Sequence, residues 1–101
     1  MARLNDRDIL LRLNSAAENA GVNLTYVHKL FFVRLLGIAD SDDKGCYTTL
    51  SVDDLAAAVD LPLRTVTKSL NLLTACGALS LEARSRPQFR RINMSIIDEG
   101  Y

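Results

Sequence analysis

The fold of this chain is decided by the stretch LAAAVDLPLRTVTKSLNLLTACGAL, residues 55–79. An alanine-rich segment leads into a short turn at Pro62, and proline suits the first position of a new helix. Beyond the turn, three apolar residues recur at helical spacing before Gly77, a residue type that commonly ends helices. They are Val66, Leu70 and Leu73. The stretch therefore predicts two helices joined by a tight turn, the second over 62–76.

Short segments precede this helix pair. Residues 46–50 are rich in β-formers and predict a brief strand, which follows a polar loop over 40–45. Ser51 is expected to cap the first helix of the pair, because its side chain can accept a hydrogen bond from a free backbone N–H of the first turn.

After Gly77 the apolar period changes from helical to alternating. Leu79 and Leu81 share one face of residues 78–83, and a polar turn follows at 84–87. The alternation resumes in a return strand that carries Ile92, Met94 and Ile96. Two alternating runs around a short turn predict a β-hairpin.

The first 40 residues predict two more helices. One covers 5–20, with Asn5 as its N-cap and Gly21 at its end. The other covers 24–39, with Asn23 as its cap. This second helix is apolar around much of its circumference, which predicts burial on more than one side. In so small a chain, we expect another subunit to cover the second side.

The order of strand, helix, turn, helix, glycine and hairpin over residues 46–95 resembles the winged helix-turn-helix superfamily. The matching pattern is an alanine-rich helix, a turn, Thr-Val-x-x-x-Leu-x-x-Leu at 65–73 and Gly-x-Leu at 77–79. Bacterial regulators of the MarR type and plasmid replication or partition proteins share this pattern.

The resemblance implies a mostly helical α+β fold, with residues 1–101 as a single domain and 46–95 as its DNA-binding part. Regulators of the MarR type also use long helices after the wing, whereas this chain ends soon after Ser95. We therefore expect residues 1–40 to provide the surface through which two copies dimerise.

Polar side chains gather opposite the apolar stripe of the second helix of the pair. On a helical wheel, Arg64, Lys68 and Asn71 project to that side, and Thr65 and Thr67 flank them. The N-terminal half of such a helix enters the major groove in helix-turn-helix proteins, where arginine and lysine bind guanine or phosphate. These five residues are the candidates for reading DNA, and a merely solvated helix face is the alternative.

Arginines crowd the predicted hairpin, or wing. The four are Arg84, Arg86, Arg90 and Arg91. Like charges so close repel one another unless an anion compensates them, and DNA phosphates or a narrow minor groove would do so. The alternative is a charged edge that deters strand pairing. Phe89 breaks the alternation of the return strand and is expected to pack within the wing.

Two hydroxyl residues before the first helix of the pair are candidates for a phosphate contact. Thr49 and Ser51 lie where a helix N-terminus offers backbone N–H groups to an anion. Asp53 and Asp54 are next to them and oppose a close phosphate.

The charge of the chain is unevenly distributed, although its formal net charge is zero. Residues 1–60 carry six basic and nine acidic side chains, whereas residues 61–95 carry six basic side chains against Glu82 alone. A basic second half is typical of a surface that faces a polyanion.

Other classes of protein fit the sequence poorly. Cys46, Cys76 and His28 are too few and too widely spaced for a zinc site, so we expect reduced thiols that fill the core and a partly buried or interfacial histidine. No glycine-rich phosphate loop or G-x-S-x-G motif is present, so we expect neither an enzyme nor a cofactor. Because apolar runs are short and the start lacks a secretory pattern, we expect a cytoplasmic protein that does not enter a membrane.

The leading hypothesis is a homodimer that binds double-stranded DNA at specific sequences and acts as a transcriptional repressor. One alternative keeps the DNA binding but assigns it to a plasmid or phage replication or partition site. The other is a winged helix used only for protein–protein contact, and the arginine-rich wing counts against it.

Overall fold

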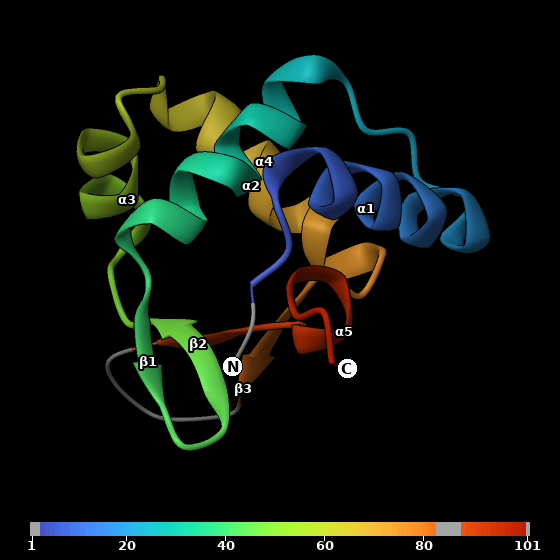
Figure 1. Cartoon of the computed structure of the whole chain (residues 1–101). Coiled ribbons are helices and arrows are strands. Elements are labelled where there is room, and N and C mark those ends of the chain that lie inside the picture. Colours follow the sequence, from blue (N-terminus) through green and yellow to red (C-terminus); the bar gives the residue numbers. More distant parts are fainter. Residues whose placement is uncertain (1–2, 83–87, 101) are drawn as a thin grey trace.

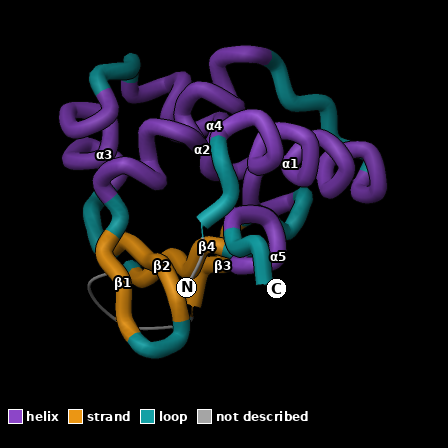
Figure 2. Tube along the Cα trace, viewed as in Figure 1, coloured by secondary structure: helices purple, strands orange, loops and turns teal. Residues whose placement is uncertain are grey.

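In the computed structural model, which describes residues 3–82 and 88–100, the longer helices lie to one side of a small antiparallel sheet (Figures 1 and 2). The fold is α+β and mostly helical, as the sequence predicts. The helices are α1 (Asp6–Ala20), α2 (Tyr26–Ile38), α3 (Val52–Val59), α4 (Leu63–Ala75) and α5 (Met94–Ile97). The strands are β1 (Asp40–Asp42), β2 (Gly45–Thr48), β3 (Leu79–Glu82) and β4 (Phe89–Ile92).

The starts of α1 and α2 depend on two different caps. The Asn5 side chain accepts a hydrogen bond from the backbone N–H of Asp8 at 2.9 Å, so the predicted cap of α1 is confirmed. Helix α2 begins later than expected, with Thr25 and not Asn23 as its N-cap. The reason is that the Thr25 backbone N–H donates to Nδ1 of His28 at 3.1 Å, in the reciprocal arrangement of a capping box.

Helix α2 is the centre of the hydrophobic core. Four of its apolar side chains are buried: Phe31, Phe32, Leu35 and Leu36. The elements packed around it are α1, α3 and α4 of the same chain. Both sides of α2 are therefore covered within one protomer. This burial removes α2 as a reason to expect a second subunit, and the dimer remains a prediction.

Helices α3 and α4 form the predicted pair. The Ser51 hydroxyl accepts a hydrogen bond from the Asp54 backbone N–H at 3.2 Å, which confirms the cap of α3. At the end of α3, Asp60 adopts a left-handed conformation with φ of 56°, and its N–H donates to the carbonyl of Ala56. Pro62 is the N-cap of α4 and not its first residue.

The apolar stripe of α4 packs against α2 and α3. Val66, Leu70 and Leu73 are buried, as predicted. Ser69 is buried on the same side, and among the described residues its hydroxyl has no hydrogen-bond partner. The stripe fixes the rotation of α4 and therefore decides which of its side chains face outward.

The four strands pair in the order β1-β2-β4-β3, all antiparallel. Strand β4 thus lies between β3, its hairpin partner, and β2, which precedes the helix pair in the chain. The hairpin is joined in this way to the segment on the other side of α3 and α4. This arrangement is compatible with a winged helix.

Residues 40–45 do not form the expected polar loop. Strand β1 pairs with β2, so that Asp40 lies opposite Tyr47 and Asp42 lies opposite Gly45. Every residue of β1 is exposed because the strand lies at the edge of the sheet. It therefore lacks the alternation of apolar and polar residues from which a strand is predicted.

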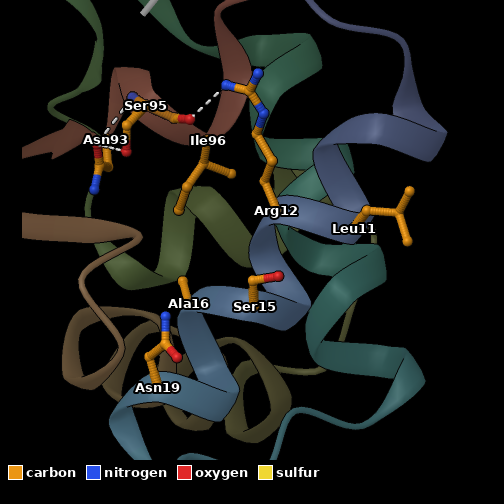
Figure 3. Close-up of a pocket in the computed structure, with 8 residues that line it drawn as sticks. All are labelled: Leu11, Arg12, Ser15, Ala16, Asn19, Asn93, Ser95 and Ile96. Atoms are coloured by element: carbon orange, nitrogen blue, oxygen red, sulfur yellow. Dashed lines mark hydrogen bonds between the residues drawn. The ribbon is translucent and has the colours of Figure 1, made fainter.

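The predicted return strand is wrong in its second half. Strand β4 ends at Ile92, and Met94 and Ile96 belong to the short helix α5. The Asn93 side chain accepts a hydrogen bond from the Ser95 N–H at 3.0 Å, which caps that helix and turns the chain (Figure 3). This single helical turn buries Met94, Ile96 and Ile97, so these apolar residues reach the core without forming a strand.

Gly45 provides a test of how closely α5 packs on the β1–β2 turn. Its φ is 124°, and a Cβ atom there would lie 2.6 Å from Sδ of Met94. We expect Gly45→Ala to lower the free energy of unfolding by about 2–3 kcal/mol, because backbone strain adds to a steric clash. Urea denaturation measures the loss.

Gly37 in α2 is the matched control. A Cβ atom there meets nothing within 4 Å. Gly37→Ala should raise the stability by about 0.5–1 kcal/mol, because alanine favours the helix more than glycine does. Equal effects of the two substitutions would contradict the packing of Met94 against the turn.

Candidate nucleic-acid interface

The outward face of α4 is a continuous polar strip. Arg64, Thr67, Lys68 and Asn71 are exposed and recur at spacings of three and four residues, opposite the buried stripe. Residues so spaced lie on one side of a helix. The structure therefore brings together four of the five residues predicted for this helix. Thr65, the fifth, is half-buried at the border of the strip.

The two cations of this strip are not used inside the protein. In residues 3–82 and 88–100, no carboxylate lies within ion-pair distance of Arg64 or Lys68. The Thr67 hydroxyl, by contrast, donates to the Leu63 carbonyl at 3.0 Å and braces its own helix. The strip thus presents to solvent the Asn71 amide and two positive charges that no carboxylate of the described ranges compensates.

The hydroxyl residues before α3 are already engaged in local structure. Thr48 is buried, and its hydroxyl accepts from the Leu50 N–H at 3.2 Å. The exposed Ser51 hydroxyl is the acceptor that caps α3. Thr49 is half-buried. A phosphate contact at this helix start would therefore involve backbone N–H groups more than free hydroxyls.

Arg91, one of the predicted wing arginines, is neutralised within the chain. Its Nη1 and Nη2 atoms lie 2.8 and 3.2 Å from the two carboxylate oxygens of Asp42, and its Nε lies 3.6 Å from Oε1 of Glu82. The hydrogen bonds from Arg91 lower the pKa of Asp42 to about 2, and the same pairing raises the pKa of Arg91. The charge of Arg91 is therefore compensated within the chain by the carboxylates of Asp42 and Glu82.

Two aromatic rings support the position of Arg91. Tyr47 and Phe89 stack with ring centroids 4.7 Å apart and an interplanar angle of 12°. The Arg91 guanidinium carbon lies 4.9 Å from the centroid of Phe89 and 5.7 Å from that of Tyr47, within the range of cation–π attraction. Phe89 is buried, so its predicted packing role is confirmed.

The environment of Arg90 is opposite to that of Arg91, because the side chain of Arg90 is buried. It is only 8% exposed, and its cross-strand partners are Thr48 on β2 and Leu81 on β3. Its Nη2 donates to Oε1 of Gln88 at 2.9 Å, whereas Nη1 is buried without a hydrogen-bond partner among the described residues. Burial lowers the pKa of Arg90. Arg84 and Arg86, also predicted for the wing, lie outside the described residues.

Sequence reasoning did not find Asp42 and Tyr47, which set the environment of Arg91. Both lie on a hairpin whose first strand had no alternating pattern. The pairing of β2 with β4 places Tyr47 opposite Arg91, and the pairing of β1 with β2 brings Asp42 to the same face. These contacts join segments that are distant in the sequence, and no local pattern reports them.

A groove between α1 and α5 contains the well-bonded Arg12. Figure 3 shows Arg12 reaching across to α5, where Nη1 donates to the carbonyl oxygens of Ser95 at 2.8 Å and Asp98 at 3.1 Å. The groove has a volume of about 350 Å³, and Leu11 at its edge is 55% exposed. Arg12 is held by backbone carbonyls, so its charge serves to fasten α5 to α1.

The described residues contain no group of three or more histidine, cysteine or acidic side chains that could hold a metal ion. Cys46 and Cys76 are both buried as free thiols. No helix in the described ranges has both the length and the apolar character needed to span a bilayer. Comparisons of the chain with protein-family models, with curated proteins and with solved structures found no match.

His28 connects the cap of α2 to the pH dependence of stability. Burial and the nearby charge of Lys68 lower its pKa from 6.5. The unfolded chain therefore binds a proton at His28 more readily than the folded chain does. The contribution of neutral His28 to the free energy of unfolding is complete above pH 6.5 and is lost as the pH falls below it. We expect the melting temperature (Tm) to fall between pH 7.5 and pH 5.5.

The substitution His28→Gln tests that assignment. Glutamine can accept the same hydrogen bond from the cap residue but does not titrate. The variant should keep the Tm of the wild type at pH 7.5 within a few degrees and lose most of the fall toward pH 5.5. An unchanged fall in the variant would show that another group causes it.

Proposed function

We propose that this protein binds double-stranded DNA with the outward face of α4 in the major groove, as a winged helix-turn-helix protein does. The observation that carries the proposal is the polar strip of α4, where Arg64 and Lys68 have no carboxylate partner within the described residues. An exposed helix face with two cations and an amide suits base edges and phosphates. The sheet order supports this, because it attaches the hairpin to the helix pair.

The proposed biological role is a sequence-specific transcriptional repressor that acts as a dimer. The central apolar side chains of α2 are buried within one protomer, so the dimer surface would use other residues of the N-terminal part. Its exposed large apolar residues are Leu11 on α1 and Tyr26 and Ile38 at the two ends of α2. Light scattering of the purified protein measures the oligomeric state. A monomer at micromolar concentration would exclude the symmetric mode of binding to two half-sites and leave DNA binding by a single copy.

The DNA-binding prediction is tested with duplexes selected by the protein from a random pool. Arg64→Ala should weaken binding to the selected duplex by about 5- to 150-fold, the range for one lost base contact. Lys68→Ala should weaken binding to all duplexes and lower the slope of log affinity against log salt by about 1 if Lys68 contacts a phosphate. Fluorescence anisotropy at several salt concentrations measures both effects.

Arg7→Ala is the matched control, because Arg7 is an exposed arginine on a different helix, α1. It should bind the selected duplex as the wild type does. An equal loss for Arg7→Ala and Arg64→Ala would show that net charge and not the α4 face governs binding. No binding of the wild type to any duplex at low salt would refute the proposed function.

A further inference from the structure

Arg90 is a buried cation that points to the helix side of the sheet. Its cross-strand partner on β2, Thr48, is buried. Residues directly opposite each other in an antiparallel pair share a face of the sheet. Arg91, the next residue, therefore lies on the other face, where it meets Asp42 and Glu82. The two consecutive arginines therefore lie on opposite faces of the sheet, where Arg91 is paired with carboxylates and Arg90 is buried.

Among the described residues, nothing compensates the charge of Arg90. In the part of the chain that the structure describes, no carboxylate lies within ion-pair distance of it, and Nη1 has no acceptor at all. Gln88 provides a single neutral acceptor for Nη2. Burying a cation and an unsatisfied N–H in this way destabilises a protein unless an anion completes the site.

A groove lies next to this guanidinium. It has a volume of about 350 Å³ and runs between the C-terminal half of α4 and the β3–β4 hairpin. The lining residues are Leu70, Asn71, Thr74, Ala75, Leu81 and Arg90. Asn71 is exposed and offers amide donors, whereas the Thr74 hydroxyl proton is committed to the Leu70 carbonyl at 2.7 Å. The last turn of α4 favours the guanidinium through its partial negative charge but gives Nη1 no acceptor.

We propose that this groove binds an oxyanion, held by the Arg90 guanidinium and the Asn71 amide, and that in the DNA complex the oxyanion is a backbone phosphate. The assignment of this oxyanion as a DNA backbone phosphate rests on the proposed function. Asn71 belongs both to the polar strip of α4 and to the groove, so DNA that lies on the strip brings its backbone to the groove. The guanidinium turns toward the groove and forms charge-assisted hydrogen bonds with the phosphate, which arginine does with two parallel donors.

The oxyanion site is tested without DNA, by thermal unfolding in inorganic phosphate against chloride at equal ionic strength. The Tm of the wild type should rise with phosphate concentration, because a ligand that binds only the folded state stabilises it. The variant Arg90→Met should lose that rise and should melt no lower than the wild type in chloride, because it removes an uncompensated buried charge. Arg7→Met, at an exposed arginine on α1, is the matched control and should keep the full rise.

An equal rise in Arg90→Met and the wild type would overturn the site, because phosphate also stabilises proteins by exclusion from their surface. The wild type provides a second readout that needs no variant. In ¹⁵N spectra of the arginine side chains, the Nε–H signal of Arg90 should shift on phosphate addition and saturate. A signal that does not move would overturn the proposal even if Arg90→Met failed to fold.

A second measurement distinguishes a DNA phosphate from a free anion. If the groove holds the DNA backbone, Arg90→Met should lose affinity about equally for selected and unrelated duplexes, and its salt slope should fall by about 1. Added phosphate at constant ionic strength should then weaken DNA binding of the wild type but not of Arg90→Met. Unchanged DNA affinity in Arg90→Met would overturn the backbone assignment and leave a free-anion site. If the wild type binds no DNA, the proposed function fails, and the phosphate titration still decides the site.

Discussion

The packing of α4 against α2 and α3 is the constraint on which the rest of the structure depends. The buried stripe of Val66, Leu70 and Leu73 fixes the rotation of α4 about its own axis, because only this rotation removes the three apolar side chains from water. Once that rotation is set, the outward positions at spacings of three and four residues are set as well. Arg64 and Lys68 are therefore exposed as a consequence of core packing and not of any contact they make themselves.

The sheet places two neighbouring arginines of strand β4, Arg90 and Arg91, in different environments. On its outer face, Arg91 is surrounded by two carboxylates and two aromatic rings, and this cluster ties β1 to β4. On its inner face, Arg90 is enclosed beside α4 with a single neutral acceptor. The alternation of side chains along a strand is the whole cause of this difference. A count of arginines in the sequence treats these neighbours as equivalent, whereas the sheet gives them separate roles.

Most of the helices could be predicted because their signals are local. The cap residues Asn5 and Ser51 each bond a backbone N–H three residues ahead, and the stripe of α4 repeats within the helix itself. Strand β1 and helix α5 could not be predicted. Strand β1 is an edge strand with no buried face, and α5 is a single turn whose three apolar residues fit either a strand or a helix. What turned the chain there was the cap at Asn93, which competes with strand extension.

The sequence by itself determined the helix pair, the first strand of the hairpin after Gly77 and most of the residues on the outward face of α4, because each rests on the periodicity of a single element. It also determined that the second half of the chain is basic. Only the tertiary structure decided that α2 is covered by its own chain, that Asp42 and Glu82 neutralise Arg91, and that Arg90 is buried without a carboxylate partner in the described residues. Each of these depends on strands and helices that are distant in the sequence and come together only when the core forms.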